Sequence, residues 1–223
     1  MRQLLLDFTR APEPTFENFV PGGNDELLHA LGAALRGAPV ERVVYMWGES
    51  GAGKTHLARA FERDLAGRRG VRVIDGVETL DEAAQAELFN AFVDRAFAFL
   101  LVTASAAPRD VPVRRDLATR LATGLTYRVQ PLTDEQKRAA LAAHARTRGF
   151  ELSEEVASYL LTHARRDMGS LMSALDAIDR YSLENGRAVT VPLLKEAMNA
   201  QPPSPQPSPK GEGANEGSGF ANG

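Results

Sequence analysis

The 223-residue sequence contains no cysteine, and this absence excludes disulfide bonds, thiolate nucleophiles and zinc sites built on cysteine. Its four histidines are scattered without metal-ligand spacing, so we do not expect a metal cluster held by protein side chains. No apolar run is long enough to cross a bilayer, and the chain does not open on a basic-then-apolar secretory leader. Together these absences favour a cytoplasmic protein without a membrane partner.

A surplus of basic residues is also missing. The formal net charge is -3 at pH 7, whereas a protein that holds duplex DNA by itself usually carries a positive excess, because neutralised phosphates supply most of the affinity. DNA is therefore not expected as the main direct ligand, although a local basic face is compatible with this balance. The length suits one large α/β domain, or an α/β core with a small second domain.

Short apolar runs alternate with helical patterns over the first 130 residues. This alternation predicts an α/β fold with a mainly parallel sheet covered on both faces. A Thr79–Glu82 pair has the capping-box pattern and is expected to open one of the helices. The expected strands are residues 43–47, 71–75, 97–103 and 126–129, and the expected helices are 24–36, 54–67, the segment after 79, and 113–122.

After Pro131 the pattern is helical throughout. Thr133 and Gln136 form a second capping-box pattern, and three more helices are expected to start near Ser153, Asp167 and Pro192. The last stretch is rich in Pro, Ser and Gly and is predicted to be disordered. We therefore expect an arm (1–14), an α/β domain (15–131), a small helical domain (132–201) and a disordered tail (202–223).

Residues 48–55 read GESGAGKT and fit the phosphate-loop pattern GxxxxGK[ST] at every fixed position. Glycines allow backbone N–H groups to surround a phosphate, and the helix that follows adds its positive amino end. The alternative is a Gly-rich hairpin turn, but the motif lies between a predicted strand and a predicted helix, where a phosphate loop belongs. We expect ATP or ADP to be bound, with Lys54 on the outer phosphates and Thr55 on Mg²⁺. The contacting residues would be Gly48, Ser50, Gly51, Ala52, Gly53, Lys54 and Thr55.

Asp75 ends the second predicted strand, which is where a second carboxylate for Mg²⁺ belongs. An Asp-Gly pair also suits a plain turn, but the phosphate loop upstream favours the metal role. Many ATPases place another acid directly after the first to activate water. Here that position is Gly76, and Glu78 is out of step. Intrinsic ATP hydrolysis is therefore expected to be weak or absent.

Two further features have competing interpretations. Arg120 lies on an amphipathic helix, where a solvated arginine is the ordinary case, and Arg109, Arg114 and Arg115 are rivals for any cationic role. Residues 3–8 read QLLLDF and combine a polar leader with apolar side chains on a proline-bounded arm. This pattern is typical of a linear peptide that binds a hydrophobic groove, but a first strand or a plug of the core would have the same composition.

Over about residues 1–200 the sequence resembles the DnaA-related AAA+ proteins, most closely the Hda family of regulatory inactivators of DnaA. The likeness is carried by five groups of residues: TFENFVPG (15–22), YMW before the phosphate loop (45–47), THL at its end (55–57), LATRL with the GL and QPLTDE that follow (117–135), and HARTRGF with DAIDR (144–150 and 176–180). It implies an AAA+ core followed by an all-helical lid domain.

The resemblance also implies roles for individual residues. Phe19 and Val20 would help to line an adenine pocket beside His56, and Arg120 falls on the position of the arginine finger. A clamp-bound protein of this type presents its finger to ATP held by DnaA, and hydrolysis switches the initiator off. The implied partners are DnaA, the DNA polymerase III sliding clamp (its beta subunit) and, through the loaded clamp, DNA, with self-association as a further option. The clamp-binding residues would be Gln3, Leu4, Leu6 and Phe8.

The sequence departs from the family pattern in three places. Only 20 residues lie between Lys54 and Asp75, so the sheet is expected to lack one edge strand. Ser105 stands where a DnaA-type pattern has an acidic sensor, and Gly169 stands at the lid position of a sensor arginine. These departures weaken the case for self-hydrolysis more than the case for a finger.

The main alternative is an AAA+ ATPase of the helicase-loader or initiator type that acts directly in replication. An initiator would need a DNA-binding helix-turn-helix domain after the lid, and a clamp-loader subunit would need a collar domain. A helicase loader has no need of the N-terminal peptide. A pure binding module with a structural nucleotide overlaps with the preferred interpretation, because an adaptor that holds ADP can still supply a finger.

Overall fold

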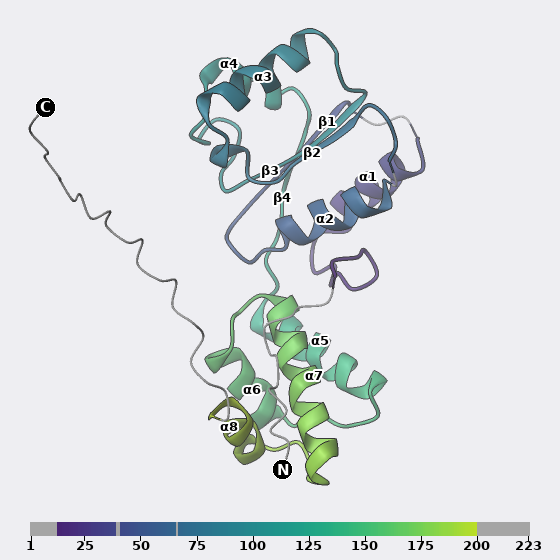
Figure 1. Ribbon diagram of the computed structural model, residues 1–223, viewed down its shortest axis with the longest axis vertical. Coiled ribbons are helices and arrows are strands. Elements are labelled where there is room, and N and C mark those ends of the chain that lie inside the picture. The colour runs from purple at the N-terminus through teal and green to yellow at the C-terminus, as the bar shows by residue number, and fades with distance from the viewer. Residues whose placement is uncertain (1–12, 39–40, 66, 200–223) are drawn as a thin grey trace, which may run out of the picture.

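The structure is a computed structural model that describes residues 13–38, 41–65 and 67–199. Within these ranges no helix has the length and apolar character needed to cross a membrane. Figure 1 shows an α/β unit and, beyond it, a group of helices formed by the later part of the chain. The elements are α1 (Asp25–Leu35), β1 (Val43–Trp47), α2 (Lys54–Asp64), β2 (Val71–Ile74), the 3-10 turn η1 (Val77–Thr79), α3 (Glu82–Val93), β3 (Phe99–Ala104), α4 (Arg115–Leu121), β4 (Leu125–Arg128), α5 (Asp134–Thr147), α6 (Glu154–His163), α7 (Met168–Asn185) and α8 (Val191–Asn199).

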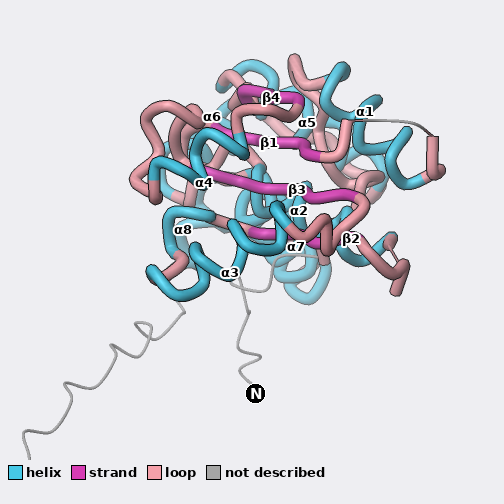
Figure 2. The backbone as a smooth tube through the Cα atoms, turned by 90° about the horizontal axis from the view of Figure 1, so that it is seen from above, coloured by secondary structure: helices cyan, strands magenta, loops and turns pink. Residues whose placement is uncertain are grey.

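The four strands form one parallel sheet in the order β2-β3-β1-β4 (Figure 2). Val43 of β1 is paired with Leu100 of β3, and Val71 of β2 with Phe99 of β3. All carboxyl ends of the strands therefore lie at one edge of the sheet, and all amino ends at the other. The predicted α/β fold with a parallel sheet and a helical lid is confirmed. In the described residues only β2 lies beyond β3, which agrees with the short connection between Lys54 and Asp75.

The central strands β1 and β3 are buried on both faces, because helices pack on each side of the sheet and successive side chains point to opposite faces. Val43 and Tyr45 of β1 pack in the cluster that includes α3 and α4, and Val44 and Met46 pack in the cluster with α1 and α2. None of these four residues is more than 4% exposed. Burying a side chain of this size contributes about 1.5–3 kcal/mol before entropy costs. The continuous apolar runs predicted as strands are thus explained by burial on two sides.

One expected helix start is wrong. Thr79 does not cap α3, because it belongs to η1 and its hydroxyl donates a hydrogen bond to the carbonyl of Gly76 at 2.7 Å. The cap is Asp81, whose carboxylate accepts from the N–H of Ala84 at 2.8 Å. The turn after β2 extends to Leu80, so α3 begins later than the capping-box pattern indicates.

Helices α5 to α8 enclose a core of their own. The predicted capping box of Thr133 and Gln136 is present, with both reciprocal hydrogen bonds. Charged groups also join α5 to α7, because Arg148 Nε lies 2.7 Å from an oxygen of the buried Asp179. The sequence therefore builds a second helical core after the sheet.

Asn24 ties the start of α1 to the segment that leads from the sheet to these helices. Asn24 occupies the N-cap position of α1, at the start of the helix predicted over residues 24–36, but its side chain makes no capping hydrogen bond. Its Nδ2 donates to the carbonyls of Pro21 (2.9 Å) and Gln130 (3.0 Å), and its Oδ1 accepts from the N–H of Gln130 at 2.8 Å. Asn24 is 4% exposed, so it holds the chain in place where it leaves β4 for the helical domain.

Candidate nucleotide site

The loop of residues 48–55 connects β1 to α2 at the carboxyl edge of the sheet. Glycine is required at two of its positions. A Cβ on Gly53, whose φ is +102°, would lie 2.7 Å from the ring of Phe19, and a Cβ on Gly48 would lie 2.8 Å from the carbonyl oxygen of Val129. The loop therefore presents backbone rather than side chains beside the amino end of α2, as a phosphate cradle requires.

Lys54 is half-buried and folds back over its own loop. Its Nζ donates to the carbonyl oxygens of Gly48 (2.7 Å) and Glu49 (2.8 Å). Burial lowers the pKa of Lys54, and the negative charges of Glu78 and Asp75 oppose that shift. The ammonium group thus lies at the mouth of the loop, in the position from which it can bind phosphate oxygens.

Asp75 lies directly after β2 and next to the phosphate loop. Its Oδ1 accepts hydrogen bonds from Thr55 Oγ1 at 3.2 Å and from Thr103 Oγ1 at 2.7 Å. The Thr55 hydroxyl and the Asp75 carboxylate thus lie side by side, and both residues are exposed to solvent. Mg²⁺ prefers oxygen ligands of this kind. The residues fit a Mg²⁺ ion carried by nucleotide phosphates.

Two residues near Asp75 were not predicted from the sequence to belong to the site: Thr103 was not singled out, and Glu78 was set aside as out of step. Thr103 is 1% exposed and bridges β2 and β3, because its Oγ1 also accepts from the N–H of Gly76 at 2.7 Å. Glu78 accepts from the N–H of Ser105 at 2.8 Å, and its other oxygen is buried without a hydrogen-bond partner among the described residues. The available signal for Thr103 was a single polar residue inside the apolar run of β3. Glu78 is brought inward by the turn η1, which the sequence did not predict.

Phe19, Val20 and His56 lie on the other flank of the loop, where the resemblance places the base of the nucleotide. Phe19 covers Gly53, and its ring centroid is 5.4 Å from that of His56. His56 Nε2 is 2.8 Å from the carbonyl oxygen of Thr15, so the segment before α1 is joined to α2. Burial lowers the pKa of His56 in spite of this contact. Phe19, Val20 and His56 are all half-buried.

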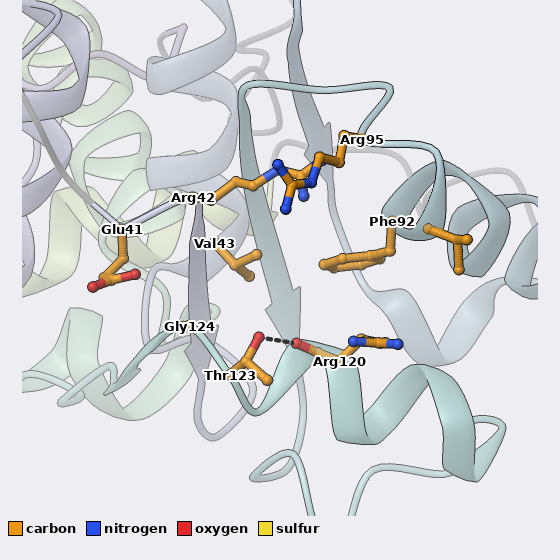
Figure 3. Close-up of a pocket in the computed structure, with 9 residues that line it drawn as sticks. Glu41, Arg42, Val43, Phe92, Arg95, Arg120, Thr123 and Gly124 are labelled. Carbon is orange, nitrogen blue, oxygen red and sulfur yellow. Dashed lines mark hydrogen bonds between the residues drawn. The ribbon is translucent and has the colours of Figure 1, made fainter.

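Arg120 lies at the opposite edge of the sheet. It is exposed near the end of α4 and lines a pocket with Val43, the first residue of β1, and Gly124, which precedes β4 (Figure 3). The phosphate loop follows the last residue of β1, and a five-residue strand separates its ends by roughly 13 Å. The structure therefore does not bring Arg120 to the chain's own phosphate loop.

The other candidate residues are spread over the molecule. The rival arginines Arg109, Arg114 and Arg115 are all exposed, and Arg114 is paired with Asp116 at 2.7 Å. Gly169 lies in the first turn of α7. The clamp-binding peptide proposed for residues 3–8 lies outside the described residues.

A parallel sheet with a phosphate loop after β1, an aspartate after β2 and a helical domain behind the core defines an AAA+ P-loop protein. Two family models match the chain: the bacterial DnaA ATPase domain over residues 11–74, and the lid domain of Hda over residues 134–198. The chain belongs to the Hda/DnaA-related AAA+ family. Arg120 lies between the two matched segments.

Solved structures share the fold. Domain III of the replication initiation protein DnaA from Thermotoga maritima matches with a TM-score of 0.66 and 22% identity, over 86% of this chain and 97% of that chain. A replication initiator DnaA bound to AMPPCP and single-stranded DNA matches with a TM-score of 0.62 and 18% identity, over 78% and 67%. The RuvB Holliday junction branch migration motor of Thermotoga maritima matches with a TM-score of 0.61 and 19% identity, over 85% and 72%.

Proposed function

We propose that the chain is a regulatory inactivator of DnaA, which uses Arg120 in trans to promote hydrolysis of ATP held by the initiator and so prevents re-initiation of replication. The two family matches support a DnaA-related AAA+ protein of DNA replication. The finer role rests on the placement of one side chain.

Arg120 lies at the amino ends of the strands, whereas the chain's own phosphate loop lies at their carboxyl ends. An arginine at this position can act only on a nucleotide that is bound to another protein molecule. A guanidinium stabilises the negative charge that develops on phosphate oxygens, and it needs no proton transfer to do so. Arg120 is exposed and has no ion pair within the described residues, so its guanidinium is available to a partner.

Within this proposal the chain's own site binds ATP or ADP with Mg²⁺. Lys54 would bind the outer phosphates, and Thr55 with Asp75 would hold the metal ion, which would neutralise phosphate charge. Phe19, Val20 and His56 would contact the base. The fit is supported by the glycine cradle and by the shared hydrogen bond of Thr55 and Asp75. The relative bound to AMPPCP is consistent with an adenine nucleotide.

Intrinsic hydrolysis is expected to be weak. Gly76 offers no side chain after Asp75, and Gly169 offers none to a γ-phosphate. Glu78 accepts from the backbone of Ser105 instead of facing solvent with both oxygens. The working reaction would therefore take place in the partner and not in this chain.

Docking on the sliding clamp is the second part of the proposal. Gln3, Leu4, Leu6 and Phe8 would enter a hydrophobic groove of the clamp. Burial of two or three such side chains yields several kcal/mol before ordering costs, enough for micromolar binding. Deletion of residues 1–8 should abolish clamp binding and leave the thermal midpoint nearly unchanged. A large loss of stability would indicate instead that the segment belongs to the core.

The test is a reconstituted assay of DnaA-bound ATP, with DNA-loaded clamp, in the presence and absence of this protein. The proposal predicts faster hydrolysis that requires the loaded clamp. Hydrolysis that does not change when the protein is added would refute it, and would leave a helicase-loader or initiator type of ATPase as the alternative.

A further inference from the structure

Arg120 shares its pocket with two other arginines. The pocket has a volume of about 350 Å³, and it lies at the amino edge of the sheet between the loop before β1, the end of α3 and the end of α4. Its lining includes Arg42, Arg95 and Arg120 but only one acidic residue, Glu41. In Figure 3 the side chains of Arg42 and Arg95 are seen at one side of the pocket and Arg120 at the other, with the ring of Phe92 drawn between them. Like charges gathered in this way repel unless an anion joins them.

Arg42 is fixed in place and has one buried nitrogen without a hydrogen-bond partner among the described residues. Its Nε donates to the carbonyl oxygen of Phe97 at 2.9 Å, and its guanidinium carbon lies 4.5 Å from the centre of the Phe97 ring. Its Nη2 is buried and has no hydrogen-bond partner among the described residues. A buried charged donor without an acceptor is costly. Arg42 lines the pocket, so an oxyanion bound there would offset the positive charge that this shielded guanidinium places beneath it.

Arg95 is held in a conformation that does not suit an arginine. Its φ is +54°, and it is the one non-glycine residue with positive φ in the described ranges. It follows the C-cap Asp94 of α3, and the N–H of Ala96 bonds back to the carbonyl of Ala91 at 3.0 Å. Glycine is the favoured residue at such a helix end. An arginine there costs stability, and this is the kind of backbone strain that accompanies function.

We propose that these three arginines form an oxyanion site for a phosphate group, and that the phosphate belongs to the nucleotide that a partner protomer presents to Arg120. Arg95 would then be a second cation that acts beside Arg120, and Arg42 would be the buried floor of the site. A planar guanidinium fork matches phosphate geometry. The assignment of the partner's nucleotide rests on the proposed trans role of Arg120, whereas phosphate binding as such does not.

The first test measures binding of inorganic phosphate to the full chain by calorimetry at low salt, in a Lys54→Ala background that weakens the phosphate loop. Arg95→Gly should weaken binding at least tenfold, because a charge-assisted contact is lost. Its thermal midpoint should be equal to or higher than that of the parent, because glycine relieves the strained backbone. The matched control is Arg146→Ala, which removes the same charge from the exposed face of α5 and should leave binding unchanged. Equal affinity for Arg95→Gly and its parent, or no binding in the parent, overturns the proposal.

The second test measures hydrolysis of DnaA-bound ATP. Arg95→Gly with Lys54 intact should lower the stimulated rate at least tenfold, and this result assigns the phosphate to the partner's nucleotide. Full stimulation by Arg95→Gly, together with lost phosphate binding, overturns that assignment and leaves a free phosphate ion as the ligand. If Arg120→Ala also stimulates fully while Arg95→Gly still loses phosphate binding, the proposed function fails and the oxyanion site stands.

Discussion

Thr103→Val is the substitution that most sharply probes how the core holds Asp75, the proposed ligand of Mg²⁺. Valine has the shape of threonine, so the change leaves no cavity and removes only the hydroxyl. That hydroxyl donates to Asp75 at 2.7 Å and accepts from the N–H of Gly76 at 2.7 Å, in a residue that is 1% exposed. The loss is one hydrogen bond to a charged acceptor and one buried donor left unpaired. Together these cost about 2–4 kcal/mol.

A small domain is stable by about 5–15 kcal/mol, so the Thr103→Val variant should remain folded. Urea denaturation should show the midpoint lowered with an unchanged slope. Asp75 would also lose the group that orients it toward Thr55, so we expect nucleotide affinity measured with Mg²⁺ to fall, and affinity measured in EDTA to change little. Thr103→Ser keeps the hydroxyl and is the control. Unchanged stability of Thr103→Val, or an equal loss of affinity with and without Mg²⁺, would refute the reasoning.

Three further predictions concern the candidate site and its support. Lys54→Ala should remove most of the nucleotide affinity measured by calorimetry, and equal affinity would show that the phosphates bind elsewhere. Asn24→Ala should lower the unfolding free energy by about 1–3 kcal/mol, because the two hydrogen bonds that join the buried Asn24 side chain to the backbone of Gln130 would be lost; a denaturation midpoint that does not move would contradict this. His56 has a folded-state pKa below its ordinary value of 6.5, so its contribution to stability is present above pH 6.5 and is lost as the pH falls through the folded pKa. Denaturation midpoints between pH 8 and 5 should therefore fall less steeply for His56→Gln than for the parent, and identical slopes would contradict the assignment.

The fold was predictable because its signals are local. The run at residues 43–47 is buried on both faces, and the phosphate loop is recognised from eight consecutive residues. The capping box of Thr133 and Gln136 forms as its local pattern predicts, with both reciprocal hydrogen bonds. At Thr79 the same pattern failed, because the turn η1 uses the threonine hydroxyl first.

The details of the candidate site depend on pairings that no local pattern contains. Thr103 meets Asp75 because the register of β2 and β3 places Ile74 opposite Val102. Asn24 bonds to Gln130, a residue 106 positions away. The placement of Arg120 at the amino edge follows from the strand order and not from the helix that carries it. The sequence singled out Arg120 and Asp75 but not Thr103, and without the strand order and register it could not place any of them relative to one another.

The central claim is that Arg120 acts in trans on ATP held by DnaA. The direct measurement is the single-turnover rate of hydrolysis of DnaA-bound ATP with loaded clamp, comparing wild type, Arg120→Ala, Arg120→Lys and the control Arg115→Ala. A finger supplied by a partner accelerates hydrolysis by about 10³–10⁵, on the order of 4–7 kcal/mol of barrier. Arg120→Ala should therefore lose nearly all stimulation while its fold, its own nucleotide binding and its clamp binding remain intact. Arg120→Lys should recover little, because an ammonium does not reproduce the planar fork, and Arg115→Ala should behave as wild type. Full stimulation by Arg120→Ala would contradict the account.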